Sequence, residues 1–283
     1  MPPLSAGFPA LLLAAALPAA VLAAALPAAA SDQGPGLPPA VEGVRLVPGW
    51  MRADGARMAA LEIRLAPGWY TYWRMPGASG IPPEFDWSGS QNLASVAYEW
   101  PRPTVFDSYG LSTIGYRETL TLPVLLRPAD PAAPLEARLD LFFGVCNDIC
   151  IPAETRIEAR IAPDAPEEGR AQIERALAAR PVDGAAAGVT ARCALAAGAE
   201  GGEITAEIVA ASGGFGRSPL TVIEADARPD LWIGPAATRA EGDRLRAVAR
   251  LDSAGGPAAL DRRALRVTVF DADRAIDIRG CAG

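Results

Sequence analysis

The sequence contains no histidine and no lysine, and arginine therefore supplies all 26 of its basic residues. Without histidine, the chain lacks the usual general base, the Cys–His and Ser–His nucleophile pairs and the commonest metal ligand. Without lysine, it can form neither a Schiff base nor a phosphate-binding P-loop. The arginine bias accompanies abundant alanine and proline and is typical of a GC-rich genome, so we draw no function from it.

Acidic side chains outnumber basic ones, 33 to 26, so the formal net charge of the 283 residues is -7. The first 31 residues carry no charged side chain, so all of this charge falls on the remainder. Nucleic-acid binding requires a basic surface, and we therefore expect no nucleic-acid partner. Hydrophobic residues make up 50% of the chain, which is enough to bury a full core, and the length fits one or two domains beyond an export segment.

An apolar, uncharged run over residues 8–30 dominates the start of the chain. It ends in three alanines, a small-x-small pattern of the kind that signal peptidases cleave, and we predict a signal peptide over 1–30 cleaved after Ala30. No basic side chain precedes the run. An uncleaved membrane anchor is the alternative, which Pro18 and Pro27 disfavour. Either segment places the rest of the chain outside the cytoplasm, and we expect a periplasmic protein in which disulfides persist.

A β-strand pattern runs from residue 41 to about 162. Short runs rich in strand formers are separated by clusters of Gly, Pro, Asn and Asp, which is typical of a β-sandwich. We predict one such domain over 31–162. The clearest predicted strands lie at 60–66, 69–73, 119–127, 136–145 and 155–161.

A helical pattern follows over residues 164–180. Asp164 and Glu167 have the spacing of a capping box, and an apolar pair four residues apart gives the helix one buried face. The sequence DGAAAG at 183–188 resembles a soft linker. We therefore assign 163–188 to a helix and linker.

The β pattern returns over 189–283, with Gly-rich turns between the runs. This pattern predicts a second β-rich domain, most simply another sandwich, so the fold class is all-β with a linker helix between two sandwiches. The predicted strands lie at 189–195, 203–210, 219–225, 244–251, 265–270 and 275–279.

Four cysteines give an exported protein two bridges, with three possible pairings. Cys146 and Cys150 are four residues apart, which on a straight strand is about 13 Å. A disulfide needs Cα atoms within about 7 Å, so the chain between them must turn. Asn147 and Asp148 suit a turn. The spacing predicts a tight hairpin with one cysteine on each arm.

The two candidate bridges differ in the length of chain that they close. A bridge between Cys193 and Cys281 would close a long loop, stabilise the second β region by roughly 4 kcal/mol and be structural. A bridge between Cys146 and Cys150 closes a very small loop, stabilises little and is easier to open. Three interpretations of this pair stay open from the spacing: a redox pair, a plain staple, or two thiolates that bind Cu(I).

Six segments of the chain have the pattern of one known family: 68–74 (GWYTYWR), 79–83 (SGIPP), 85–87 (FDW), 100–101 (WP), 112–116 (STIGY) and 146–154 (CNDICIPAE). Together they resemble the N-terminal periplasmic domain of the DsbD thiol:disulfide interchange protein family, and more closely its ScsB-type branch. The resemblance covers roughly 41–162, and the region after 189 resembles, more weakly, an extra β region of that branch.

This resemblance implies an immunoglobulin-like sandwich and a protein-disulfide reductase that needs no cofactor of its own. Cys146 and Cys150 would be the catalytic pair, and in the family the second cysteine forms the mixed disulfide with the donor, which points to Cys150. Electrons would come from a thioredoxin-like domain or a DsbD/CcdA-type membrane donor. They would pass to disulfide-bearing client proteins in the periplasm, with a link to cytochrome c biogenesis.

The resemblance also implies a cap loop over the cysteines, at 106–111 (FDSYGL). The family's capping aromatic falls at Ser108, so Phe106 or Tyr109 would have to replace it. The family's active-site tyrosines match Tyr70 and Tyr72, for which simple packing is an equal alternative. The predicted rim residues are Phe106, Ser108, Tyr109, Gly110, Tyr70 and Tyr72.

Full-length family members continue into a membrane domain and a thioredoxin-like domain, and we find neither here, so a separate electron donor is expected. The motif holds Asp148 and no neighbouring cation, and an acid disfavours the thiolate. We therefore expect Cys150 to be mainly the sulfur that a partner thiolate attacks. The alternative from another class is a non-catalytic β-sandwich module that handles copper or an apoprotein, with two structural disulfides.

Overall fold

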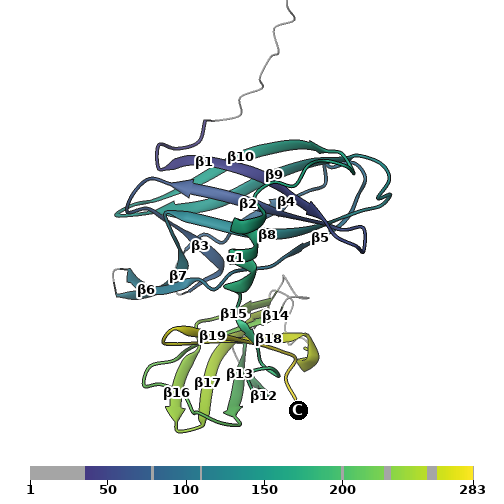
Figure 1. The fold of residues 1–283 in the computed structure, drawn as a ribbon. Helices are drawn as coiled ribbons and strands as arrows, with labels where there is room; N and C mark the ends of the chain where they lie inside the picture. The colour runs from purple at the N-terminus through teal and green to yellow at the C-terminus, as the bar shows by residue number, and fades with distance from the viewer. Residues whose placement is uncertain are drawn as a thin grey trace, which may run out of the picture. The chain divides into compact units, whose positions relative to one another are not determined.

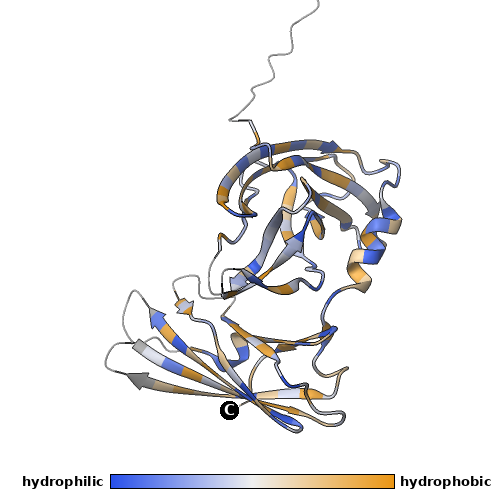
Figure 2. Cartoon of the chain, turned by 90° about the vertical axis from the view of Figure 1, so that its left-hand side faces the viewer, coloured by the Kyte–Doolittle hydropathy of each residue, from blue (hydrophilic) through white to orange (hydrophobic). Residues whose placement is uncertain are grey.

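The computed structural model describes residues 36–77, 80–108, 110–198, 201–225, 231–253 and 260–282, and it is built mainly of antiparallel β-strands (Figure 1). Hydrophobic and hydrophilic residues alternate along many of these strands, as the sequence pattern predicts (Figure 2). No helix within these ranges is long and apolar enough to span a bilayer. The predicted signal peptide at 1–30 lies outside the described residues.

The first β region is a sandwich of two antiparallel sheets, as predicted. One sheet has the strand order β1-β2-β8-β5, and the other has the order β10-β9-β3-β7-β6 with β4 paired to β9. The strands are β1 (Val41–Met51), β2 (Arg57–Leu65), β3 (Tyr70–Gly77), β4 (Glu84–Asp86), β5 (Leu93–Tyr98), β6 (Thr104–Ser108), β7 (Leu111–Arg117), β8 (Thr119–Pro128), β9 (Leu135–Cys146) and β10 (Cys150–Ile161).

Alternate residues of these strands point between the two sheets and form the core. In β9, Leu139, Leu141 and Phe143 are at most 2% exposed, whereas the residues between them are only half-buried. Leu122 of β8 faces the same core from the other sheet. Burial of each such side chain contributes about 1.5–3 kcal/mol, so the period of two fixes which face of β9 turns inward.

The α-helix between the two β regions begins six residues later than predicted. It spans α1 (Arg170–Ala178), and its N-cap is Gly169, which has a φ of 70° and offers no side-chain cap. The predicted capping box of Asp164 and Glu167 is therefore wrong. The buried face is as predicted, since Ile173 is 0% exposed and packs against β1 and β2.

The chain before α1 is held in a non-helical conformation by contacts with the first sheet. The guanidinium of Arg57 donates to the carbonyl oxygens of Ala165 and Pro166, each at 3.4 Å. Glu168 forms an isolated β-bridge with Gly49. A proline also disfavours the helical conformation of the residue before it. These tertiary contacts outweigh the local capping pattern.

The second β region also consists of two sheets, with the orders β11-β19-β18-β14 and β12-β13-β17-β15, and with β16 paired to β17. The predicted linker contributes to one of them, because β11 pairs in parallel with β19. The elements are β11 (Val182–Asp183), β12 (Val189–Gly198), β13 (Gly201–Ala210), β14 (Leu220–Ala225), β15 (Leu231–Ile233), β16 (Ala237–Glu241), β17 (Arg244–Ser253), the 3-10 turn Arg262–Ala264, β18 (Leu265–Asp271) and β19 (Arg274–Arg279).

The second region has its own apolar core, but part of it joins the first. Ile204 and Ile208 of β13 and Val267 of β18 are fully buried in the second core. Phe270 and Ala275 belong instead to the core cluster of the first sandwich. Residues Gly34–Gly283 accordingly form one compact unit.

Candidate functional site

A β-hairpin presents Cys146 and Cys150 directly opposite each other. Cys146 is the last residue of β9 and Cys150 the first of β10, and the two are paired in the antiparallel register. The turn between them is closed by the amide of Asn147, which donates to the carbonyl oxygen of Ile149 at 3.1 Å. The cysteines form a disulfide with a Cα–Cα distance of 4.2 Å. The hairpin expected from the spacing is therefore present.

The two cysteines of this disulfide differ in their access to solvent. Cys146 is 0% exposed and lies in an aromatic cluster, whereas Cys150 is an exposed residue. Ile149, in the turn between them, is 64% exposed. A macromolecule that approaches the hairpin therefore meets Cys150 first, with an apolar side chain beside it.

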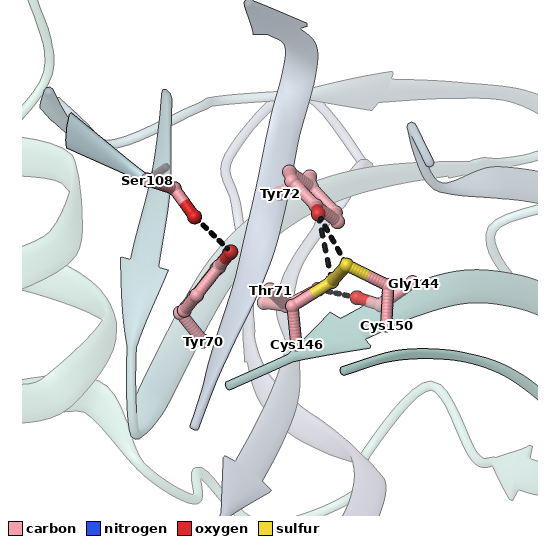
Figure 3. The surroundings of a disulfide bond; sticks show 7 residues. All are labelled: Tyr70, Thr71, Tyr72, Ser108, Gly144, Cys146 and Cys150. Atoms are coloured by element: carbon pink, nitrogen blue, oxygen red, sulfur yellow. Dashed lines mark hydrogen bonds between the residues drawn. A yellow bond between two sulfur atoms is a disulfide. The ribbon is translucent and has the colours of Figure 1, made fainter. Parts of the chain in front are cut away.

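The hydroxyl of Tyr72 lies against both sulfurs (Figure 3). It is 2.7 Å from Sγ of Cys146 and 3.3 Å from Sγ of Cys150. The sulfurs of a disulfide carry no hydrogen, so the tyrosine hydroxyl is the donor in both contacts. The Tyr72 hydroxyl therefore donates hydrogen bonds to the Cys146–Cys150 disulfide.

Burial keeps the Tyr72 hydroxyl protonated. The residue is 2% exposed, and desolvation raises the pKa of Tyr72 well above its usual value near 10. Interaction with Tyr70 raises this pKa further. The hydroxyl can therefore donate to a sulfur throughout the physiological pH range.

Glycine at position 144 allows the Tyr72 ring to lie over β9. A Cβ atom on Gly144 would come within 2.7 Å of the Ile81 Cβ and 3.0 Å of the Tyr72 ring. The hydroxyl of Thr71 also holds Gly144 in place, because it donates to the carbonyl oxygen of Gly144 at 2.9 Å (Figure 3). A glycine inside a strand marks such a close approach.

Tyr70 connects β3 to the hairpin formed by β6 and β7, which is where the cap loop was expected. Its hydroxyl shares a hydrogen bond of 3.1 Å with the hydroxyl of Ser108 (Figure 3). Its ring meets the ring of Phe106 edge to face, with centroids 4.8 Å apart. The guanidinium of Arg117 lies 4.2 Å from the centroid of Phe106. The two contacts with Tyr70 thus hold this hairpin beside the disulfide, and the contact between Arg117 and Phe106 holds β7 and β6 together.

Phe106 is the described aromatic residue of this hairpin that packs against the cluster of Tyr70, Tyr72 and Cys146. Ser108, the position of the family's capping aromatic, contacts Tyr70 by its hydroxyl. Tyr109 lies outside the described residues. Gly110 has a φ of 79° in the turn, and its amide donates to Asp107 at 3.0 Å.

Two residues of the site were missed from the sequence. Gly144 had a recognisable signal, since it interrupts a run of strand formers two residues before a cysteine. Arg117 had none, because its place over Phe106 depends on the register of β6 and β7.

The second disulfide joins Cys193 of β12 to Cys281, which follows β19. Both cysteines are 4% exposed and belong to the core of the second β region. Their sequence separation is 88. Within the described ranges, neither sulfur has a hydrogen-bond donor comparable to the Tyr72 hydroxyl. In the same part of the chain, no group of three or more His, Cys, Asp or Glu residues is arranged to hold a metal ion.

Comparison with known proteins adds two findings. Residues 44–162 match the family described as "Thiol:disulfide interchange protein DsbD, N-terminal". The chain also resembles the crystal structure of the N-terminal periplasmic domain of ScsB from Proteus mirabilis, with 24% sequence identity and a TM-score of 0.61 over 82% of this chain and 90% of that chain. No curated protein sequence matches the chain. The structural likeness shows a shared fold across both β regions.

Proposed function

Because residues 44–162 match the family of DsbD N-terminal domains, we propose that this chain is a thiol–disulfide exchange protein whose Cys146–Cys150 pair relays electrons between other proteins. One observation carries the proposal. A short-range disulfide lies at a hairpin end, with one exposed cysteine, one buried cysteine and the Tyr72 hydroxyl within hydrogen-bond distance of both sulfurs.

The first half of the exchange reduces the pair. A thiolate of the donor protein attacks Sγ of Cys150, and the bond between Cys146 and Cys150 breaks. Its electron pair leaves on Sγ of Cys146, where the Tyr72 hydroxyl stabilises the new thiolate. The donor's second thiolate then attacks the donor sulfur of the mixed disulfide and releases Cys150. The donor departs as a disulfide, and its two protons complete the dithiol.

The second half returns the pair to its starting state. The thiolate of Cys150 attacks a disulfide of the client, and one client sulfur leaves with the electron pair. Cys146 then attacks Sγ of Cys150, re-forms the intramolecular disulfide and releases the second client sulfur. The client gains two electrons and two protons, and the chain acts as a protein-disulfide reductase without another redox group.

Partners and location follow from the same proposal. The donor is a thioredoxin-like domain or a DsbD/CcdA-type membrane protein, and the clients are periplasmic proteins with disulfides. The ScsB domain of similar fold is described as periplasmic, which supports export of this chain by the signal peptide predicted at 1–30. We assign the exchange to the domain at 31–162 and a structural role to the Cys193–Cys281 bridge in the region 189–283.

Trapping of the mixed disulfide tests the proposal. Cys146→Ala leaves Cys150 without its partner, so an intermediate with a thioredoxin-like protein should accumulate and be visible on a non-reducing gel. Cys150→Ala is the matched control and should trap none, because Cys146 is buried. Equal trapping by both variants, or by neither, would contradict the assignment of Cys150.

A further inference from the structure

The strand that carries Tyr72 loses its regular pairing directly after this residue. The ladder of β3 with β7 is regular up to Tyr72 and resumes only at Gly77, with a shift in register. The ladder of β3 with β9 ends at Thr71. Residues 73–76 therefore have no ladder partner on either neighbouring strand. Something other than the sheet must hold the backbone that follows Tyr72.

An ion pair with the second β region supplies one anchor for this segment. Arg74 donates from Nε and Nη2 to the two carboxylate oxygens of Glu224 in β14, each at 2.8 Å. The side chains are only 14% and 7% exposed. Nη2 also lies 3.5 Å from the hydroxyl of Thr268 in β18. Bidentate pairing of a guanidinium with a carboxylate fixes orientation as well as distance.

An aromatic contact supplies the second anchor. Trp73 is 0% exposed and meets the ring of Phe270 edge to face, with centroids 5.3 Å apart. The guanidinium of Arg74 lies 3.8 Å from the Trp73 ring centroid. Both residues that directly follow Tyr72 are therefore held by β14 and β18, strands that are more than 140 residues away in the sequence.

We infer that Arg74 is a positioning residue through which the second β region keeps the Tyr72 hydroxyl on the reactive sulfurs. Arg74 follows Tyr72 by two residues on β3, so contacts that fix Arg74 also limit the movement of the backbone that carries Tyr72. The hydrogen bond to sulfur weakens steeply with distance and angle, so a small shift of β3 is enough to lose it. This inference rests on the proposed exchange at Cys146 and Cys150.

The test compares two buried bidentate ion pairs. Arg74→Gln and Glu224→Gln should each slow reduction of the Cys146–Cys150 disulfide by a thioredoxin-like donor by about fivefold. The reason is that a shifted Tyr72 hydroxyl loses part of its hydrogen bond to the Cys146 thiolate that forms. Asp277→Asn is the matched control. Asp277 accepts from Arg266 at 2.6 and 3.0 Å in the second region, is similarly buried, and should leave the rate unchanged.

A double variant separates positioning from general destabilisation. In the Tyr72→Phe background the hydroxyl is absent, so Arg74→Gln should no longer change the exchange rate. In addition, Arg74→Gln should raise the pKa of the Cys146 thiol, measured by thiolate absorbance in the reduced protein, because the thiolate loses its donor. Circular dichroism establishes that each variant is folded, and Glu224→Gln serves as the second variant if Arg74→Gln is not.

Each outcome decides between the inference and the proposed function. If the unmodified protein exchanges no electrons with the donor, the proposed function fails. If it does exchange them and both ion-pair variants keep the full rate, the positioning role of Arg74 is overturned. An undiminished effect of Arg74→Gln in the Tyr72→Phe background would overturn it as well, because Arg74 would then act without the hydroxyl.

Discussion

The two disulfides of this chain use the same bond in opposite surroundings. Cys193 and Cys281 are 88 residues apart and both buried in an apolar core. Cys146 and Cys150 are four residues apart, with one of them exposed and a tyrosine hydroxyl on both sulfurs. The first bond constrains a long stretch of chain, whereas the second constrains almost none.

This difference is the basis on which we propose that Cys146–Cys150 is a labile bridge and Cys193–Cys281 a permanent one. Loop entropy makes the long-range bridge contribute roughly 4 kcal/mol and the short-range bridge roughly 2 kcal/mol. Access adds to this contrast, because an attacking thiolate must reach a sulfur in line with the bond. Sequence separation therefore sets what a bridge stabilises, and burial sets what can open it.

The largest expected effect separates the two bridges by activity. Cys150→Ser should reduce electron transfer from donor to client to the uncatalysed background, because no mixed disulfide can form. The double variant Cys193→Ala, Cys281→Ala should retain transfer at temperatures at which it stays folded. Insulin reduction coupled to a thioredoxin-like donor measures both. Loss of transfer in the second variant while it is folded would break the comparison.

Stability should respond in the reverse order. Removal of both Cys193 and Cys281 should lower the free energy of unfolding by roughly 4 kcal/mol, and removal of both Cys146 and Cys150 by roughly 2 kcal/mol. Urea denaturation monitored by tryptophan fluorescence measures the two losses. A larger loss from the Cys146–Cys150 pair would show that this bridge is the structural one.

Tyr72→Phe removes only the hydroxyl oxygen that distinguishes the surroundings of the Cys146–Cys150 disulfide from those of the second disulfide. A hydrogen bond to a charged group contributes about 1.5–3 kcal/mol, so the rate of reduction by the donor should fall about tenfold to a hundredfold. Because burial raises the pKa of Tyr72 above its usual value, the neutral hydroxyl dominates below that value, and the loss should be constant between pH 6 and pH 9.

Tyr98→Phe is the control for this variant. The Tyr98 hydroxyl accepts from the indole of Trp87 at 2.8 Å and has no contact with the cysteines. Its removal should leave the exchange rate unchanged. A Tyr72→Phe effect that disappeared as the pH rose from 6 to 9 would instead mean that the hydroxyl ionises in this range.

The smallest effect concerns the hairpin beside the disulfide. Phe106→Ala removes an edge-to-face contact with Tyr70 and a cation–π contact with Arg117, together about 1–2.5 kcal/mol. Alkylation of Cys146 in the reduced protein should become about tenfold faster. Val105→Ala changes the neighbouring residue of β6, which is 37% exposed, and should have no effect. Equal alkylation rates of Cys146 in the two variants would show that Phe106 does not shield this cysteine.

The β framework and the hairpin that carries Cys146 and Cys150 were predictable because their causes are local. Alternation along β9 gives the buried face, and the three residues between Cys146 and Cys150 leave room only for a turn. The resemblance to DsbD N-terminal domains is confirmed over residues 44–162. Tyr72 could be singled out only by that resemblance, since nothing in its spacing from the cysteines indicates a contact.

The remaining features depend on contacts between distant segments. The start of α1 was misplaced because Arg57 and Gly49 hold the preceding residues in another conformation. The linker was expected to be irregular, yet Val182 and Asp183 pair with β19. Arg74 lies in the matching segment 68–74, but nothing in the sequence indicated its partner, because Glu224 is 150 residues away.

Equilibration of the protein in thiol–disulfide buffers of graded potential, followed by alkylation and mass spectrometry of each cysteine pair, addresses the two bridges together. We expect Cys146 and Cys150 to be reduced at the potential of a thioredoxin-like donor while Cys193 and Cys281 stay oxidised. A Cys146–Cys150 bond that remains closed at that potential, or that opens only together with the buried bridge, would contradict an electron relay at this hairpin.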